Sequence, residues 1–191
     1  MTKITMFGKG NMGQAIGQSF EQAGNIVRYF ASKDLVDDIG DIVVLAVPYQ
    51  AALEIAKEQR ERLTAKIVID ISNPLNFETF DELVVPSDSS AAQEIAALLP
   101  DTTVVKGFNT NFASTLSSKK LGTNHPVVVQ LATDDEKAVE VIRKALEGSG
   151  LQVINAGKLK RARELEAMGF LQMTLAASEQ ISWNGGFGIF Q

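Results

Sequence analysis

The N-terminus of this chain carries the feature that most constrains its fold, an apolar strand at residues 3–7 that ends in a Gly-x-Gly-x-x-Gly loop and opens directly into a helix. In such a unit Gly8 permits the tight turn, Gly10 lets the backbone approach a pyrophosphate, and Gly13 allows close helix–strand packing. The free N–H groups and dipole of the new helix attract phosphate. The motif therefore predicts a dinucleotide site along this loop, which includes Lys9. A glycine-rich turn that binds nothing is the alternative.

Composition limits the other classes of function. The chain has 191 residues, 45% of them hydrophobic, which suits one compact domain over residues 1–191. A net charge of −5 without clustered Lys and Arg argues against a nucleic-acid partner. There is no cysteine, which fits a reducing cytoplasm, and no apolar run approaches the length that spans a bilayer. The single histidine, His125, is expected in a loop, and no acidic cluster forms a convincing metal site.

Strand and helix patterns alternate along the chain, which predicts an α/β fold. We expect a Rossmann-type, doubly wound, mostly parallel sheet with a shortened first half. Strands are predicted at residues 26–30, 42–46, 67–71, 103–107, 127–132 and 152–154. Helices are predicted after Pro48, at 91–99, at 111–119, from Thr133 with Glu136 completing a capping box, and at 160–178, with 79–90 irregular.

The link between the second and third strands is short. Residues 31–41 are too few for a helix, another strand and a second helix. We therefore infer that the outer unit of the usual mononucleotide half is missing. The second strand then lies at an edge of the sheet, and the adenine of a bound dinucleotide is unusually open.

The end of the second strand indicates which cofactor binds. An NAD site typically places Asp or Glu there, about 20 residues beyond the glycines. This chain has Ser32 and Lys33, whose hydroxyl and ammonium suit an added 2′-phosphate. Asp34 follows, and we expect it to point outward. The prediction is NADP; the alternative is that Ser32 caps a turn and Lys33 is solvated.

Two later strand ends lie where the nicotinamide belongs. One is Ala46-Val47-Pro48-Tyr49 and the other is Ser72-Asn73-Pro74-Leu75. Small residues and a proline keep the backbone close to the ribose and ring, and Asn73 is a candidate anchor for a hydroxyl or carboxamide. Alternatively, these prolines only terminate strands.

Several segments together resemble a known family. The glycine loop, V-L-A-V-P-Y-Q-A-A, I-D-I-S-N-P-L-N, V-V-K-G-F-N-T-N-F-A and N-A-G-K-L-K-R-A-R-E-L-E are similar to the deazaflavin (coenzyme F-420)-dependent NADP oxidoreductases. A similar fold and the K-x-F-N-T element also occur in the cytoplasmic oxidoreductase domain of membrane ferric reductases, which passes electrons from NADPH to a flavin. The resemblance implies cofactor contacts at Gly8, Gly10, Asn11, Met12, Ser32, Lys33, Ala46, Val47, Pro48, Asn73 and Pro74, with Phe108, Asn109 and Thr110 close to the nicotinamide.

The predicted reaction is hydride exchange between NADP(H) and a flavin, deazaflavin or related small electron acceptor. Such a transfer needs mainly alignment of two rings in a water-poor cleft, so no catalytic acid or base is assigned. The sequence shows no obvious catalytic Lys-Asp set. Candidates for the acceptor side are Asn109, Asn111, Met168, Leu171 and Met173, although methionines at helical spacing are often core residues.

The C-terminal part, a helix and tail from about residue 158, separates the alternatives. Dehydrogenases of similar N-terminal pattern carry a sizeable helical domain, whereas this chain ends in a short aromatic tail. A dehydrogenase or reductase of a small carbonyl or imine remains one alternative, and a non-catalytic NADP(H)-sensing module another. The tail predicts a homodimer interface, or else folds back onto its own core. Its apolar residues are Trp183, Phe187, Ile189 and Phe190.

Overall fold

The computed structural model describes residues 1–31 and 34–190. These residues form a mixed sheet of seven strands in the order β2-β1-β3-β4-β5-β8-β9. All neighbouring pairs are parallel except β5 and β8. This is the expected α/β Rossmann-type architecture. The strands are β1 (Lys3–Phe7), β2 (Ile26–Phe30), β3 (Ile42–Leu45), β4 (Ile67–Asp70), β5 (Thr103–Lys106), β8 (Val128–Ala132) and β9 (Gln152–Gly157).

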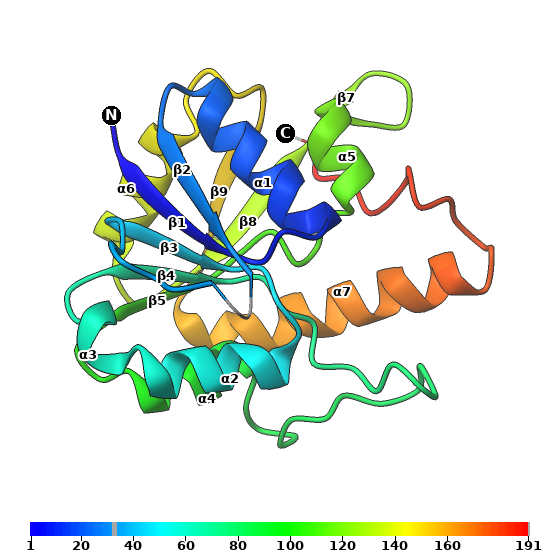
Figure 1. Ribbon diagram of the computed structural model, residues 1–191. Helices are drawn as coiled ribbons and strands as arrows, with labels where there is room; N and C mark the ends of the chain where they lie inside the picture. The colour runs from blue at the N-terminus through cyan, green and yellow to red at the C-terminus, as the bar shows by residue number, and fades with distance from the viewer. Residues whose placement is uncertain (32–33, 191) are drawn as a thin grey trace.

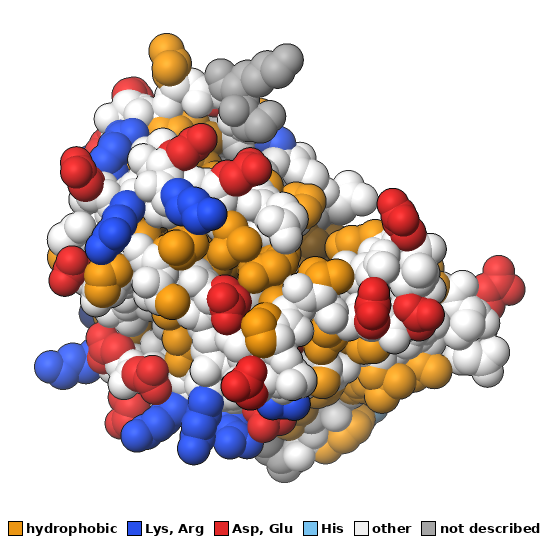
Figure 2. Space-filling view, turned by 90° about the horizontal axis from the view of Figure 1, so that it is seen from below, with side chains coloured by type: hydrophobic (Ala, Val, Ile, Leu, Met, Phe, Trp, Pro, Cys, Tyr) orange, Lys and Arg blue, Asp and Glu red, His pale blue; other side chains and the backbone are white. Residues whose placement is uncertain are grey.

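Helices cover both faces of the sheet (Figure 1). One face packs against α1 (Asn11–Gln22), α5 (Ala113–Ser118) and α6 (Glu136–Ala145). The other packs against α2 (Tyr49–Glu58), α3 (Arg60–Leu63), α4 (Ala91–Leu98) and the first residues of α7 (Ala162–Ala177), which follows the short 3-10 turn η1 (Leu159–Arg161). On the face seen from below, acidic and basic side chains are interspersed with hydrophobic ones (Figure 2).

Strand β3 is apolar throughout because it is buried on both sides. In β3, Ile42 and Val44 join one core and Val43 and Leu45 join the other. The registers also align the carboxyl ends of neighbouring strands: Phe7 pairs with Leu45, Leu45 with Asp70, and Asp70 with Lys106. The loops that follow these strands therefore emerge along one edge, where open sheets bind ligands.

The shortened first half is confirmed in the described residues. The edge strand β2 is followed, at residues 34–41, by a segment that contains no helix or strand. Arg28 and Asp37, at a distance of 3.5 Å between Nη1 and Oδ1, tie this segment to the edge strand.

The sixth helix corrects one expectation. It begins at Glu136, and its N-cap is Asp135, whose side chain accepts from the Lys137 N–H at 2.9 Å. Thr133 instead donates its hydroxyl to the Val104 carbonyl at 2.8 Å, so the predicted capping box from Thr133 is wrong. This bond ties the Thr133 side chain to β5 and takes it away from the helix N-terminus.

Two short strands were not predicted from the sequence. Strand β6 (Lys120–Leu121) pairs with β7 (His125–Pro126), so His125 lies in a hairpin strand and not in a loop. Each of these strands has only two residues, and β7 contains a proline. Such short segments show almost none of the alternation by which strands are predicted. The ring of His125 contacts Phe190 of the tail at a centroid distance of 4.8 Å.

The C-terminal tail follows α7 and packs back against its own chain (Figure 1). Trp183 stacks at a tilt on Phe112, with ring centroids 4.9 Å apart, and its carbonyl accepts from the Ser114 hydroxyl. The Phe187 N–H donates to Gln172 Oε1 at 2.9 Å. The alternative of a folded-back tail therefore describes this chain, and a homodimer interface on the remaining exposed surface stays a prediction.

Candidate functional site

The glycine loop has the geometry of a tight strand-to-helix turn. Gly8 has a φ of +117°, and a Cβ placed there would lie 2.1 Å from the Ala46 carbonyl oxygen. The next helix, α1, begins at Asn11 after Gly10, and no side chain caps its N-terminus. A Cβ on Gly10 would meet no atom within 4 Å. The loop thus leaves open space in front of uncapped helix N–H groups, which is the arrangement that attracts phosphate.

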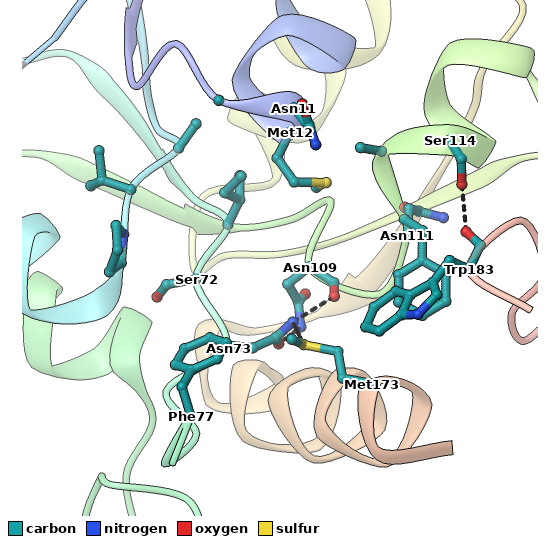
Figure 3. Close-up of a pocket in the computed structure, with 17 residues that line it drawn as sticks. Asn11, Met12, Ser72, Asn73, Phe77, Asn109, Asn111, Ser114, Met173 and Trp183 are labelled. Atoms are coloured by element: carbon teal, nitrogen blue, oxygen red, sulfur yellow. Dashed lines mark hydrogen bonds between the residues drawn. The ribbon is translucent and has the colours of Figure 1, made fainter. Parts of the chain in front are cut away.

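A cavity of about 610 Å³ adjoins this loop at the carboxyl ends of β3, β4 and β5 (Figure 3). Its walls come from distant segments: the start of α1, three strand-end loops, the start of α5, one residue of α7 and the tail. None of the described lining residues carries a charged side chain. They are Gly10, Asn11, Met12, Ala46, Val47, Pro48, Ile71, Ser72, Asn73, Phe77, Asn109, Asn111, Phe112, Ala113, Ser114, Met173 and Trp183.

Two strand-end loops are locked together on one wall. Asn73 donates to the Asn109 carbonyl at 2.9 Å, and Asn109 donates to Asn73 Oδ1 at the same distance. Asn109 also donates to the Leu165 carbonyl of α7 at 2.8 Å, and Asn73 contacts Met173 Sδ at 3.5 Å. Figure 3 shows these side chains grouped beneath Met12. The helix α7 therefore holds the position of both loops.

Three buried oxygens of the cavity residues have no hydrogen-bond partner within the described chain. They are Ser72 Oγ, Asn109 Oδ1 and Asn111 Oδ1. A buried acceptor without a partner is costly unless a ligand or water completes it. A carboxamide supplies two N–H donors, so these residues fit the nicotinamide end of a dinucleotide, while the glycine loop fits its phosphates.

A buried ionic cluster lies directly behind the same wall. Lys106, which is fully buried, places Nζ 2.7 Å from Asp70 Oδ2 and 2.8 Å from Glu166 Oε1, and it also donates to the Ser72 carbonyl. Asp70 Oδ1 accepts from the Ser72 N–H at 3.0 Å. Although burial opposes ionisation of Lys106, the two carboxylates outweigh it and raise its pKa. Burial also raises the pKa of Glu166.

This cluster was not predicted from the sequence, because its members are far apart in the chain and only the fold brings them together. The register of β4 and β5 makes Asp70 and Lys106 neighbours, and α7 brings in Glu166. Glu166 also accepts from the Ala91 and Ala92 N–H groups at 2.9 and 3.3 Å. An apolar strand ending in Asp beside one ending in Lys was the only available signal.

A second cavity of about 230 Å³ lies between β1, β2 and α2, where the adenosine half of a dinucleotide is expected. Asp34 lines it and accepts from the Ala31 N–H at 2.8 Å and from Lys9 Nζ at 2.7 Å. Its side chain remains 39% exposed, in keeping with the expectation that Asp34 points outward, while the Ala31 amide and Lys9 hold it beside the cavity. These two bonds lower its pKa. Ser32 and Lys33 lie outside the described residues.

The other predicted residues divide between wall and core. Gly8 and Val47 line the smaller cavity, and Gly13 packs close behind the Gly8 carbonyl. Pro74 is buried beside the cavity, where its carbonyl accepts from the Val84 N–H. Several candidates line neither cavity: Phe108 and Thr110 are buried, Met168 is half-buried against Gln130, and Leu171 is 52% exposed.

Sequence reasoning missed the aromatic wall. Phe112 and Trp183 stack on one side of the cavity, and Phe77 stands on the other (Figure 3). The tail was recognised as needing burial, but its place was not predictable. Phe77 lies in an irregular segment that has no periodicity.

Comparisons with known proteins agree with this geometry. Residues 27–74 match the family model described as NADP oxidoreductase, coenzyme F420-dependent. The chain is 30% identical to an F420-dependent NADP reductase of Methanocaldococcus jannaschii over 132 aligned residues. The aligned residues make up 68% of this chain and 59% of the relative. The resemblance to this family is confirmed.

Two further proteins extend the comparison. The chain is 31% identical to the metalloreductase STEAP3 of Rattus norvegicus over 108 residues, which is 56% of this chain and 21% of that protein. It thus spans well under two thirds of either curated relative. A crystal structure of a proposed F420-dependent NADP reductase from Arthrobacter sp. FB24 superposes on all of both chains with a TM-score of 0.82 at 22% identity, which shows the shared fold.

No helix in the described residues has the length and apolar character to cross a membrane. Within residues 1–31 and 34–190, no cluster of three or more His, Asp or Glu side chains could hold a metal ion.

Proposed function

We propose that this chain is an NADP(H)-dependent oxidoreductase that exchanges hydride between the nicotinamide and a planar flavin or deazaflavin acceptor. The observation that carries the proposal is the uncharged cavity, which runs from the uncapped start of α1 to an aromatic wall. The reductase names of the relatives support the same assignment.

The dinucleotide would lie along the glycine loop. Its phosphates face the N–H groups that follow Gly10, its adenosine occupies the cavity beside Asp34, and its carboxamide meets Ser72, Asn109 and Asn111. When bound, NADPH supplies a hydride, two electrons with one proton. The adenosine cavity lies at the sheet edge beside β2, which supports an open adenine.

The acceptor would lie against the opposite wall. Phe112 and Trp183 give this part of the cavity an aromatic, apolar lining. Aromatic surfaces pack well against planar rings. The protein residues position the two rings and exclude water, and none of the lining side chains is an acid or base.

The first test measures binding of NADPH and NADH by calorimetry to the wild type and to Lys33→Ala. We expect tight NADPH binding to the wild type and weaker binding to the variant. The sequence predicts that the Lys33 ammonium pairs with the 2′-phosphate, and the variant lacks it. Equal affinity for the two cofactors in the wild type would contradict the NADP assignment. Absence of any binding would leave the glycine loop as architecture alone.

The second test measures NADPH oxidation with and without added FMN or deazaflavin. Turnover only with an added ring supports the proposal. Turnover of a small imine or carbonyl without the ring would show a dehydrogenase, and binding without any turnover would show a sensing module.

Light scattering on the full chain and on a chain truncated at Ser182 tests the predicted homodimer; a monomer in both would contradict it.

A further inference from the structure

The large cavity has no charge of its own, yet a charged cluster adjoins it. Its described lining contains neither acidic nor basic side chains. Behind the wall formed by Ser72, the Lys106 ammonium bonds the Ser72 carbonyl, and Asp70 accepts from the Ser72 N–H. The cluster is therefore one residue away from the cavity surface.

The cluster carries an excess of negative charge. One ammonium, on Lys106, faces the carboxylates of Asp70 and Glu166, and all three side chains are at most 1% exposed. The helix α4 offsets part of this charge through its two N–H bonds to Glu166. Because water does not surround these groups, their field extends into the neighbouring apolar space.

Tyr49, which follows the cavity residue Pro48, also responds to the cluster. Burial raises the pKa of its hydroxyl first, and the negative charges of Glu94, Glu166 and Asp70 raise it further. Carboxylates in such a cluster favour positive over negative charge nearby.

We propose that the Lys106–Asp70–Glu166 cluster sets the redox preference of the pocket by favouring the positively charged oxidised nicotinamide over the neutral reduced ring. The inference rests on the proposed function, which places the nicotinamide against Ser72. A pocket that binds NADP⁺ more tightly than NADPH makes its bound NADPH a stronger hydride donor. Glu166 would then act on the cofactor without touching it.

The test compares the dissociation constants of NADP⁺ and NADPH, measured by calorimetry, in the wild type and in Glu166→Gln. Glutamine keeps the shape of the side chain and removes one negative charge, and its single amide oxygen accepts from only some of the donors Lys106, Ala91 and Ala92. We expect NADP⁺ binding to weaken roughly tenfold relative to NADPH, the effect of a unit charge about 10 Å away at an effective dielectric constant of about 20. Glu140→Gln, an exposed carboxylate on α6, is the matched control and should leave the ratio unchanged.

The outcomes separate the two proposals. If neither cofactor form binds the wild type, the proposed function fails. If both bind and the ratio is the same in Glu166→Gln as in the wild type, the redox inference is overturned, because a purely structural role weakens both forms equally. Asp70→Asn makes the same charge change should Glu166→Gln not fold. A wild type that binds NADPH more than about tenfold tighter than NADP⁺ also overturns it.

Discussion

Asn73 and Asn109 bond each other in both directions, each through its amide N–H, at 2.9 Å. Asn73 lies in the loop after β4 and Asn109 lies in the loop after β5. The pair therefore joins these two loops through side-chain hydrogen bonds. Gly169 on α7 makes room for them, since a Cβ there would lie 2.4 Å from Asn73 Oδ1.

Replacing Asn109 with alanine removes both of its donated bonds, to the Leu165 carbonyl and to Asn73 Oδ1. We expect the free energy of unfolding to fall by about 2 kcal/mol, measured by urea denaturation. Asn124→Ala, on an exposed turn, should change it by less than about 0.5 kcal/mol. Equal losses in the two variants would show that the locked pair contributes nothing.

Two glycines of one loop should respond differently to alanine. Gly8→Ala forces a Cβ onto the Ala46 carbonyl and should cost about 3 kcal/mol or more in unfolding free energy. Gly10→Ala has room in the protein, so it should fold normally but lose about tenfold in NADPH affinity, because the methyl occupies the phosphate space. Thermal unfolding and calorimetry measure the two effects. Unchanged NADPH affinity in Gly10→Ala would place the pyrophosphate elsewhere.

The Lys9–Asp34 ion pair should oppose a 2′-phosphate. In Asp34→Asn, the repulsion is lost and Lys9 becomes available, so NADPH should bind about threefold tighter, the scale of an exposed ion pair. NADH should bind more weakly, because the acceptor for its ribose hydroxyl is reduced. The effect should shrink at high salt. Asp37→Asn, an exposed carboxylate that pairs with Arg28, is the control, and an equal response there would contradict the prediction.

Trp183 is the chain's one tryptophan, so its fluorescence reports on the cavity directly. We expect FMN or a deazaflavin to quench it. Trp183→Leu should raise the KM for the acceptor about tenfold through lost ring packing, and leave the NADPH affinity within about twofold. Phe190→Leu, in the same tail but outside the large cavity, should change neither. A larger effect on NADPH than on the acceptor would reverse the assignment of the two walls.

Lys106 should control how stability depends on pH. The pKa of Lys106 is raised in the folded protein. Its contribution to the free energy of unfolding is therefore fully present below the ordinary lysine pKa of about 10 and is lost as the pH rises through the folded pKa. Lys106→Met leaves two buried carboxylates side by side and should cost about 3 kcal/mol at neutral pH. Because burial raises the pKa of Glu166, protonation of this carboxylate should restore part of this loss as the pH falls from neutral into the acid range.

Urea denaturation across this pH range measures the effect. Lys57→Met, which changes an exposed lysine on α2, should follow the wild type throughout. A Lys106→Met profile parallel to that of the wild type would show that the carboxylates do not depend on the ammonium.

Local pattern was sufficient for the sheet and the loop. Continuous apolar runs such as the one in β3 predict strands buried on both faces, and the glycine spacing predicts the turn before α1. The start of α6 was misplaced because Thr133 and Asp135 are both good capping residues, and only the bond from Thr133 to β5 excludes it.

The sequence by itself determined the positions of the strands along the chain, the glycine turn and the family resemblance, since each depends on short segments of consecutive residues. Tertiary structure alone decided the walls and the charge of the site. Trp183 reaches the cavity only because the tail returns across α5, and Lys106, Asp70 and Glu166 meet only through strand register and the path of α7. Contacts between distant segments depend on how the elements pack, and no local periodicity encodes them.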